Sequence, residues 1–309
     1  MNIFNSLDEI KNPEGNVIAL GNFDGIHLGH QEIIKRAVKD GEGSGFKSSV
    51  FTFSNHPRNL LSKGEKVKNI LFNDDKERII KSLGVDYIYN IPFTEELMKM
   101  KPVDFIESIL IEKMNMKEVI CGFNYRFGNR AEGDVKLLTE ESVKRDFGLH
   151  IVEAYKVDDE IVSSSLIRKY ISQGNMGACR KLLGRNYSIG GEVVVGNRLG
   201  KTIGFPTSNL NIDETMVSPP NGVYITKCYY NDVAYPSITN VGVKPTIGKY
   251  DKNVETHIFN FDTELYGKMI KVEFLEKLRE ERVFDSVEEL SKEITANCIT
   301  ARAYHRQHK

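Results

Sequence analysis

The sequence has no tryptophan, and it has only four cysteines and nine prolines among its 309 residues. The cysteines are Cys121, Cys179, Cys228 and Cys298, and no two of them form a C-x-x-C pair. This spacing fits neither a zinc knuckle nor the disulfide framework of a secreted domain. We therefore expect the protein to work in a reducing compartment, the cytoplasm.

The sequence also lacks an excess of either charge, because its 42 Lys and Arg residues are balanced by 43 Asp and Glu residues. Binding to a nucleic-acid backbone needs a surplus of basic residues, so we expect no nucleic-acid partner. No apolar run approaches the roughly 20 residues of a membrane span, and the N-terminus lacks the layout of a signal peptide. We therefore expect no membrane association. From the length of the chain we expect roughly two domains of about 150 residues each.

The first part of the chain alternates apolar strand-like segments with charged segments of helical spacing. The predicted strands are 17–20, 49–53, 87–91, 119–121 and 149–154, and the predicted helices are 31–39, 75–83, 103–114 and 135–147. Short apolar strands separated by helices are typical of a doubly wound parallel sheet, because such strands are buried on both faces. The sequence thus predicts a Rossmann-like α/β domain.

From about residue 190 the pattern changes to successive strands without helices between them. The predicted strands are 192–195, 222–230, 237–241, 255–261 and 269–274, followed by a helix at 287–306. This order favours an antiparallel barrel or sandwich with a C-terminal helix. The join is expected within the helical stretch 163–183.

Residues 17–31, VIALGNFDGIHLGHQ, run from a strand into a helix through a turn that contains Gly21, Gly25 and Gly29. Glycines let a backbone approach a ligand closely, and a helix N-terminus attracts phosphate. His27 and His30 are three residues apart, so both can donate hydrogen bonds to one phosphate group. The alternatives are a metal site, although catalytic zinc needs a third protein ligand, and a turn with two surface histidines.

Residues 21–30, GNFDGIHLGH, resemble the G-x-F-D-G-x-H-x-G-H signature of the nucleotidyltransferases. In that superfamily the H-x-G-H element contacts the triphosphate of the nucleotide. The resemblance implies that the turn binds ATP and that its two histidines stabilise charge. The implied nucleotide-binding residues are Gly21, Phe23, Asp24, Gly25 and Gly29.

Residues 162–168, VSSSLIR, resemble the second signature of that family, I-S-S-T-x-I-R, with Ser165 in place of the threonine. Hydroxyl groups at a helix start, with an arginine one turn later, suit a leaving pyrophosphate. The resemblance implies nucleotide binding by Ser163, Ser164 and Ser165 and charge stabilisation by Arg168. A simple helix N-cap is the alternative.

Residues 121–128, CGFNYRFG, and 51–58, FTFSNHPR, resemble two blocks of the members that adenylylate flavins. They imply flavin contacts from Asn124 and Arg126. Many members have Asp at the position of Asn124, and for Phe51 and Phe53 we favour ordinary packing in the core.

Residues 196–209, GNRLGKTIGFPTSN, carry spaced glycines followed by P-T-x-N. The order is not that of a Walker A loop, but such glycines can form a backbone cradle for phosphate. We expect nucleotide binding by Gly196, Gly200, Lys201 and Gly204. Thr207 and Asn209 lie on one face of an extended strand, and their oxygens suit Mg²⁺. A structural β-turn is the alternative.

Residues 255–261, ETHIFNF, alternate polar and apolar side chains, so Glu255 shares a face with His257 and Phe259. A carboxylate beside a phosphate cradle can accept a proton from a substrate hydroxyl. We therefore predict that Glu255 is a general base, and the alternative is a solvated residue on an exposed face.

These stretches, together with 219–224, 239–246 and 284–290, resemble the riboflavin kinase domain in family order. Over nearly the whole chain, the two halves are similar to the prokaryotic bifunctional riboflavin kinases/FMN adenylyltransferases, or FAD synthetases. The resemblance implies an adenylyltransferase domain at 1–184 and a kinase domain at 185–309, the latter a six-stranded antiparallel barrel.

The resemblance also implies two reactions. Riboflavin would take the γ-phosphate of ATP, giving FMN and ADP, and the FMN phosphate would then attack the α-phosphate of a second ATP, giving FAD and pyrophosphate. ATP would be the co-substrate, and Mg²⁺ would be the cofactor that accompanies it. The alternatives are a chain with one active domain, acting on riboflavin or as a nucleotidyltransferase of another substrate, and a non-catalytic flavin-binding regulator. The sequence leaves the oligomeric state open.

Overall fold

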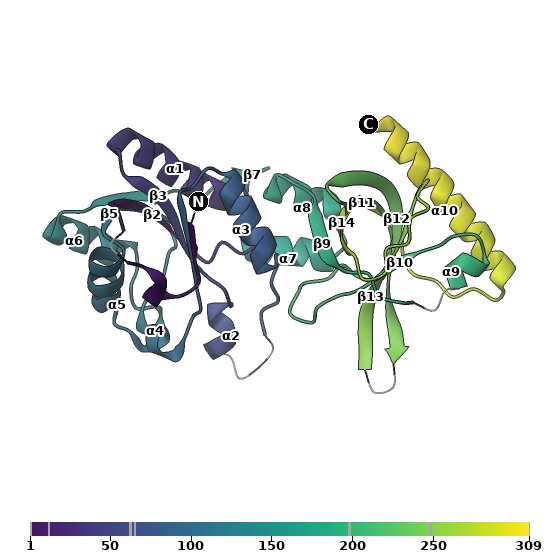
Figure 1. Ribbon diagram of the computed structural model, residues 1–309, viewed down its shortest axis with the longest axis horizontal. Helices are drawn as coiled ribbons and strands as arrows, with labels where there is room; N and C mark the ends of the chain where they lie inside the picture. Colours follow the sequence, from purple (N-terminus) through teal and green to yellow (C-terminus); the bar gives the residue numbers. More distant parts are fainter. Residues whose placement is uncertain are drawn as a thin grey trace. The chain divides into compact units, whose positions relative to one another are not determined.

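The computed structural model describes residues 2–11, 13–61, 64, 66–196, 199–246 and 249–308. Contacts between residues divide the chain into two compact units, Met1–Ser164 and Ser165–Lys309 (Figure 1). Each unit has its own six-stranded sheet. The two-domain organisation expected from the chain length therefore corresponds to two separate folding units.

The first unit is built on a parallel sheet with the strand order β1-β4-β3-β2-β5-β6. The strands are β1 Asn2–Phe4, β2 Asn16–Leu20, β3 Lys47–Phe53, β4 Tyr87–Ile91, β5 Met116–Gly122 and β6 Gly148–Val152. The predicted Rossmann-like α/β class is confirmed. Strand β1 was not predicted from the sequence; it is a three-residue edge strand that is specified by its pairing with β4.

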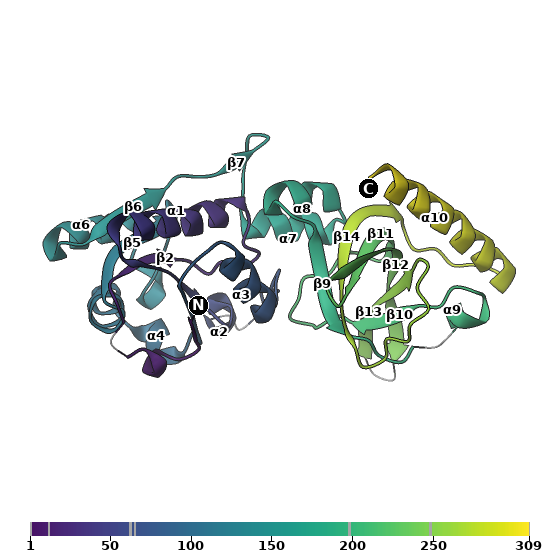
Figure 2. The same cartoon turned by 45° about the horizontal axis from the view of Figure 1, so that its top comes forward.

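Helices cover both faces of this sheet (Figures 1 and 2). They are η1 Leu7–Glu9, α1 Leu28–Ser44, α2 Pro57–Leu61, α3 Asn73–Ser82, α4 Glu95–Lys99, α5 Pro102–Asp104, the π-helical η2 Phe105–Lys113, η3 Asn129–Ala131 and α6 Val135–Arg145. A short hairpin of β7 Lys156–Val157 and β8 Glu160–Ile161 follows β6. In β2, Val17 belongs to the core cluster that contains Ile34 of α1, whereas Ile18 belongs to the cluster that contains Ile106 of η2.

The order of the strands determines where a ligand can bind to this unit. From β2 the chain continues to its neighbour β3, and it later crosses to β5 on the other side of β2. In open α/β sheets, ligands bind outside the carboxyl ends of the strands at such a reversal of strand order. The glycine-rich turn at 21–27 leaves the carboxyl end of β2, so the fold places this turn at the switch point.

The second unit contains an antiparallel sheet with the order β10-β13-β12-β11-β14-β9. The strands are β9 Tyr187–Glu192, β10 Ser208–Asn211, β11 Gly222–Tyr230, β12 Val233–Thr246, β13 Lys249–Ile258 and β14 Met269–Arg279. A bridge between Val194 and Asn209 connects the two edges of the sheet, so that it nearly closes into a barrel. The predicted antiparallel class is confirmed.

Short helices precede this sheet and a long helix follows it. α7 Ser164–Ser172 and α8 Met176–Leu183 come before β9, α9 Leu199–Thr202 lies between β9 and β10, and α10 Val287–Gln307 ends the chain. Helix α10 lies along the barrel (Figures 1 and 2) and contacts β12. Helix α8 packs against β14 and β9. The contacts thus separate the units about 20 residues before the predicted boundary of 184/185, and the functional boundary stays a prediction.

Four hydroxyl groups form a hydrogen-bonded row inside the barrel. Thr226 Oγ1 lies 2.8 Å from Ser237 Oγ and 2.8 Å from Thr239 Oγ1, which in turn lies 2.9 Å from Thr256 Oγ1. All four residues are completely buried. Because buried hydroxyl groups are costly unless they find partners, this row favours a single register of β11, β12 and β13.

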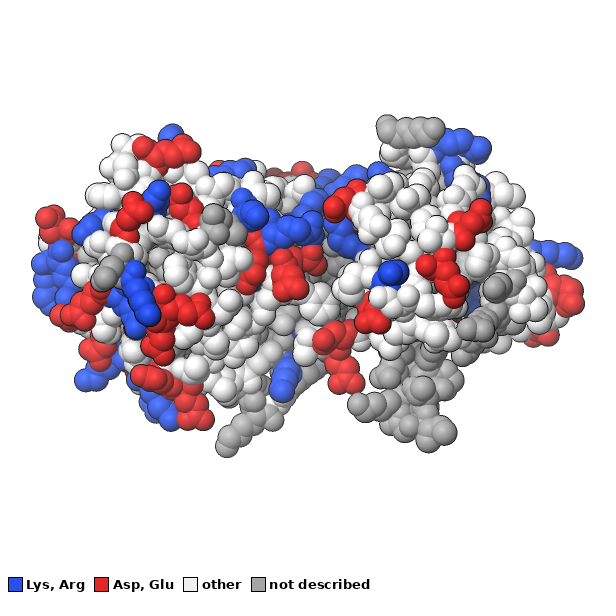
Figure 3. All heavy atoms as spheres, viewed as in Figure 1, with Lys and Arg blue, Asp and Glu red and all other residues white. Residues whose placement is uncertain are grey.

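The charged side chains are mixed on the surface. On the face shown in Figure 3, acidic and basic residues are interspersed over each unit, in keeping with the balanced composition. Among the helices of the described ranges, none combines the length and the apolar composition that crossing a membrane requires.

Lys76 of α3 is a buried cation at the carboxyl end of β3. The residue is 6% exposed, and its Nζ donates a hydrogen bond of 2.6 Å to the carbonyl oxygen of Phe53. Burial lowers the pKa of Lys76 from 10.5 to about 8, although the nearby Asp24 carboxylate acts in the opposite direction. Between these two values the unfolded chain binds a proton that the folded chain does not bind.

The stability of the protein is therefore expected to rise with pH in this interval. Relative to K76M, the free energy of unfolding of the wild-type protein should increase by about 3 kcal/mol between pH 8 and 10.5. Urea unfolding followed by circular dichroism at a series of pH values measures this difference. A difference that is constant over the interval would show that Lys76 is protonated in the folded state throughout.

Candidate active sites

The turn after β2 has a strained backbone. Phe23, Gly25 and Ile26 have positive φ angles of 48°, 82° and 36°. For a β-branched residue such as Ile26 this conformation costs on the order of 1–3 kcal/mol. Ile26 is completely buried, and Gln31 Nε2 donates a hydrogen bond of 3.1 Å to its carbonyl oxygen. Strain of this kind persists only where the surrounding structure enforces it, and it is concentrated at functional sites.

Asp24 connects this turn to two other segments. Its Oδ1 accepts hydrogen bonds from the backbone N–H groups of Ile70, at 2.9 Å, and Leu71, at 3.4 Å. Ser164 Oγ donates a hydrogen bond of 2.8 Å to the carbonyl oxygen of Asp24. Asp24 thus holds the turn in place, and its predicted contact with a nucleotide stays a prediction.

His27 caps helix α1 with its own ring. Nδ1 accepts a hydrogen bond of 3.2 Å from the backbone N–H of His30, so the proton of the neutral ring lies on Nε2. The two imidazole rings are stacked, with centroids 3.6 Å apart and an interplanar angle of 18°. The capping bond therefore fixes the tautomer of His27, and Nε2–H is the donor that a phosphate oxygen can accept.

A cavity of about 660 Å³ lies beside these two histidines. Nine of the predicted site residues line it: Gly21, Phe23, His27, Gly29, His30, Asn124, Arg126, Ser163 and Ser164. Asp24 and Gly25 are not part of the lining. Ser165 and Arg168 lie in α7 within the second unit, and their contact with a nucleotide stays a prediction.

The cavity lining includes residues that the sequence analysis did not select. Arg58 and Arg130 add positive charge to that of Arg126, and aromatic rings form much of the remaining wall. These rings are Phe53, Phe93, Phe105, Phe123, Tyr125, Phe127 and Tyr155. Phe51 is a core residue, as the analysis favoured, whereas Phe53 both packs against the core and lines the cavity. Arg58 stands in one of the quoted blocks, but nothing in the sequence pointed to Arg130.

The metal alternative for the two histidines finds no support in the grouping of side chains. Within the parts of the chain that the structure describes, no set of three or more His, Cys, Asp and Glu side chains is placed to share one metal ion. A cavity with stacked imidazoles, three arginines and aromatic walls instead offers donors for phosphate oxygens and surfaces for flat rings.

The second unit contains a cavity of about 310 Å³ between the barrel, the segment after β14 and helix α10. Gly200, Thr207 and Glu255 line it, as does His257. Apolar side chains of Phe205, Val223, Ile238, Phe284, Leu290 and Ile294 form a wall suited to a flat hydrophobic ring. The side chain of Lys201 lies outside the described part of the structure.

Two of the predicted glycines are required by close approaches. A Cβ atom at Gly196 would lie 2.5 Å from Asn209 Nδ2, and one at Gly200 would lie 2.3 Å from the carbonyl oxygen of Phe205. Gly204 directly precedes Phe205 in the sequence and has a positive φ of 88°. The spaced glycines therefore permit the tight path of this segment past Asn209, and their binding of phosphate stays a prediction.

Asn209 and Glu255 lie opposite each other on the neighbouring strands β10 and β13. Asn209 is 4% exposed and is not part of the cavity lining, whereas Thr207 and Glu255 are. Glu255 Oε1 accepts a hydrogen bond of 2.9 Å from Asn253 Nδ2. The structure thus brings the predicted base and the two predicted metal ligands into one region of the barrel.

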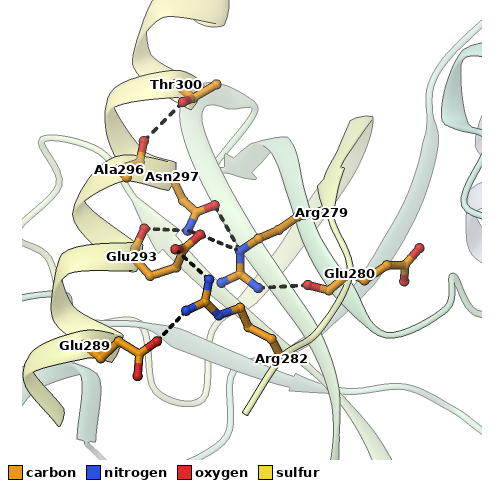
Figure 4. Close-up of polar contacts among 8 residues, drawn as sticks. All are labelled: Arg279, Glu280, Arg282, Glu289, Glu293, Ala296, Asn297 and Thr300. Atoms are coloured by element: carbon orange, nitrogen blue, oxygen red, sulfur yellow. Dashed lines mark hydrogen bonds and ion pairs between the residues drawn. The ribbon is translucent and has the colours of Figure 1, made fainter. Parts of the chain in front are cut away.

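An ionic network joins the segment after β14 to α10 (Figure 4), and Arg279, Arg282 and Asn297 of this network line the cavity. Arg279 Nε, at the end of β14, lies 3.1 Å from Glu293 Oε1 and 3.2 Å from Asn297 Oδ1. Arg282 pairs with both Glu289 and Glu293. These contacts hold the segment after β14 against the helix. These contacts were not predicted from the sequence, because they join residues of different elements.

His257 is another residue of this cavity that was not selected as a site residue. Its Nδ1 lies 2.8 Å from the carbonyl oxygen of Pro206, and its ring packs edge-on against Phe205. Burial lowers the pKa of His257, so the neutral ring is favoured. The contact with Pro206 fixes the segment that carries Thr207.

Comparisons with known proteins find a matching family model for each of the two parts of the chain. The family model described as FAD synthetase matches residues 9–166, and the model described as riboflavin kinase matches residues 183–305. Similar proteins include the bifunctional riboflavin kinase/FMN adenylyltransferases of Bacillus subtilis and Escherichia coli. The former is 34% identical over 90% of this chain and 89% of that protein, and the latter is 30% identical over 94% and 93%.

A crystal structure described as a macrolide-efflux protein from Streptococcus pneumoniae has the same fold. Its TM-score is 0.88 at 30% sequence identity, and the match covers 97% of this chain and 98% of that one. The two family models match in the order of the two units, and the relatives match over almost their full length. The chain belongs to the family of bifunctional riboflavin kinases/FMN adenylyltransferases, with an FAD synthetase domain followed by a riboflavin kinase domain.

Proposed function

We propose that the first cavity carries out the adenylyl transfer of this family, in which FMN attacks the α-phosphate of ATP and pyrophosphate leaves. The observation that carries this proposal is the stacked pair of His27 and His30 at the start of α1, with Nε2–H of His27 as a fixed donor. Donors fixed before the reaction stabilise the charge that grows on phosphate oxygens. Arg168 is proposed to do the same from α7.

The other residues of this cavity bind the two substrates. Ser163 and Ser164 offer hydroxyl groups to the nucleotide, and Asn124 and Arg126 lie among the aromatic rings that suit a flavin. The reaction needs no covalent intermediate on the protein, so catalysis consists of positioning and charge stabilisation. This division of roles explains why the cavity combines basic and aromatic side chains.

We propose that the second cavity carries out the phosphorylation of riboflavin. Glu255 accepts the proton of the 5′-hydroxyl group while this oxygen forms its bond to the γ-phosphorus of ATP and the bond to ADP breaks. The apolar wall with Phe284, Leu290 and Ile294 holds the flavin ring, and the segment with Gly200 holds phosphate.

Mg²⁺ is the expected companion of ATP in this cavity. Thr207 and Asn209 supply a hydroxyl and an amide oxygen, which are the hard oxygen ligands that Mg²⁺ prefers, and substrate phosphates complete such a site. When bound, the ion neutralises part of the negative charge on the transferring phosphate. The donor chemistry fits: Thr207 lines the cavity just before β10, and Asn209, two residues later, lies opposite Glu255 on the neighbouring strand.

We further propose that adenylylation belongs to residues 1–184 and phosphorylation to residues 185–309. Support comes from the separate cavities, each of which lies within one unit of the fold. We also propose the cytoplasm as the location, because all four cysteines are free and buried, as in proteins of reducing compartments. A product assay with riboflavin and Mg-ATP tests the whole proposal, since FMN must appear first and FAD after it.

Replacing the stacked histidines tests the first cavity. In H27A/H30A, the rate of FAD formation from supplied FMN should fall by at least 10²–10³-fold, roughly the worth of one oxyanion donor. FMN formation from riboflavin should stay within about twofold of wild type, because the second cavity is unchanged. H150A is the matched control, since His150 lies on β6 outside the cavity. Normal adenylylation by H27A/H30A would refute the assigned role.

Replacing Glu255 tests the second cavity. Glu255→Gln keeps the size of the side chain but removes the basic carboxylate, so FMN formation should drop by roughly 10²–10⁴-fold. Riboflavin affinity should change far less, and adenylylation of supplied FMN should be normal. Glu276→Gln on β14 is the control, because Glu276 is an exposed residue outside the cavity. Turnover of E255Q within a few-fold of wild type would make Glu255 an ordinary face residue.

A further inference from the structure

Asn253 is a buried amide that contacts two of the proposed kinase residues at once. Its side chain belongs to β13 and the residue is only 2% exposed. Nδ2 donates one hydrogen bond of 2.9 Å to Glu255 Oε1 and another of 3.0 Å to Asn209 Oδ1. Both protons of the amide nitrogen are therefore used, one for the proposed base and one for the proposed metal ligand.

The pairing of strands produces this arrangement. Residues 253 and 255 point to the same face of β13 because side chains alternate along a strand. On the neighbouring strand β10, Asn209 lies opposite Glu255, and Asn211 lies opposite Asn253. The amide of Asn253 thus reaches Asn209 diagonally across the two strands and Glu255 along its own strand.

The first of these hydrogen bonds restricts the carboxylate of Glu255, and the second restricts the amide of Asn209. Oε1 is engaged by the amide, and Oε2 makes no hydrogen bond with another residue in the described ranges. A flexible glutamate side chain held in one orientation loses less freedom when the substrate binds. The amide therefore leaves Oε2 as the oxygen to meet the hydroxyl group, while Asn253 itself stays outside the lining of the cavity.

We propose that Asn253 is a positioning residue of the kinase reaction, which orients the Glu255 carboxylate and the Asn209 amide oxygen relative to each other through one side-chain nitrogen. The inference rests on the roles proposed above for Glu255 and Asn209. It extends them to a residue that contacts neither substrate but sets the geometry of the groups that do. Partners of this kind typically contribute about 10–100-fold to activity.

Two substitutions separate positioning from simple filling of space. N253A removes both donors and leaves a small void, whereas N253D keeps the size of the side chain but replaces the donor by a second carboxylate facing Glu255. If Asn253 only fills space, N253D should keep more activity than N253A. If it positions Glu255, kcat for FMN formation should fall about 10–100-fold in N253A and at least as far in N253D, with riboflavin KM within about threefold of wild type.

A double-mutant cycle identifies the residue through which Asn253 acts. In the E255Q background, adding N253A should lower the remaining rate by less than about threefold, because the carboxylate that Asn253 orients is already gone. N211D is the matched control, since Asn211 is the exposed residue opposite Asn253 on β10 and should leave kinase activity unchanged. Adenylylation of supplied FMN should be normal in all variants.

Several results would overturn the inference. These are a kcat within twofold of wild type in N253A and N253D, clearly higher activity in N253D than in N253A, or multiplication of the effects of N253A and E255Q in the double variant. If N253A fails to fold, N253D carries the test, because it preserves the size of the side chain. Failure of the wild-type protein to make FMN would instead refute the proposed function itself, so the two failures are distinguishable.

Discussion

Burial of β2 on both of its faces is the constraint from which the first site follows. All five residues of this strand are buried, and the four apolar ones, residues 17–20, alternate between the two core clusters. The strand must therefore lie in the middle of the parallel sheet, between β3 and β5, and the turn after it must emerge at the reversal of strand order. The strained φ of Ile26 and the capping bond of His27 depend on this position, because only a rigid surrounding can maintain them.

In the second unit, the pairing of strands has the corresponding role. The buried row of Thr226, Ser237, Thr239 and Thr256 connects β11, β12 and β13 inside the barrel. A shift of register by one residue would turn these hydroxyl groups outward and move Glu255 away from the cavity. The pairing of β13 with β10 then brings Asn209 and Asn253 to the carboxylate. Each cavity thus depends on a fully buried part of its own sheet. In the first unit this part is strand β2, and in the second it is the row of hydroxyl groups.

The sequence was sufficient for features that are encoded locally. Alternating strands and helices predicted the α/β class of the first unit, and successive strands without helices predicted the antiparallel class of the second. The spacing of His27 and His30 predicted that both rings could face one bound group. It was insufficient where distant segments meet. Arg130, which lines the first cavity, lies in η3 with a positive φ of 52°. Asn253 contacts Asn209 only through the register of two strands. The short β1 and the glycine-containing β9 were missed or misplaced, because tertiary pairing outweighs weak strand propensity.

The central claim is that one chain carries two complete and separate sites, joined only by the FMN that one makes and the other uses. Mixing E255Q with H27A/H30A tests this directly, with riboflavin and Mg-ATP as the only substrates and FAD as the measured product. Either variant alone should make almost no FAD, whereas the mixture should make it, because FMN released by H27A/H30A can be adenylylated by E255Q. A mixture that accumulates FMN but forms no FAD would contradict the account.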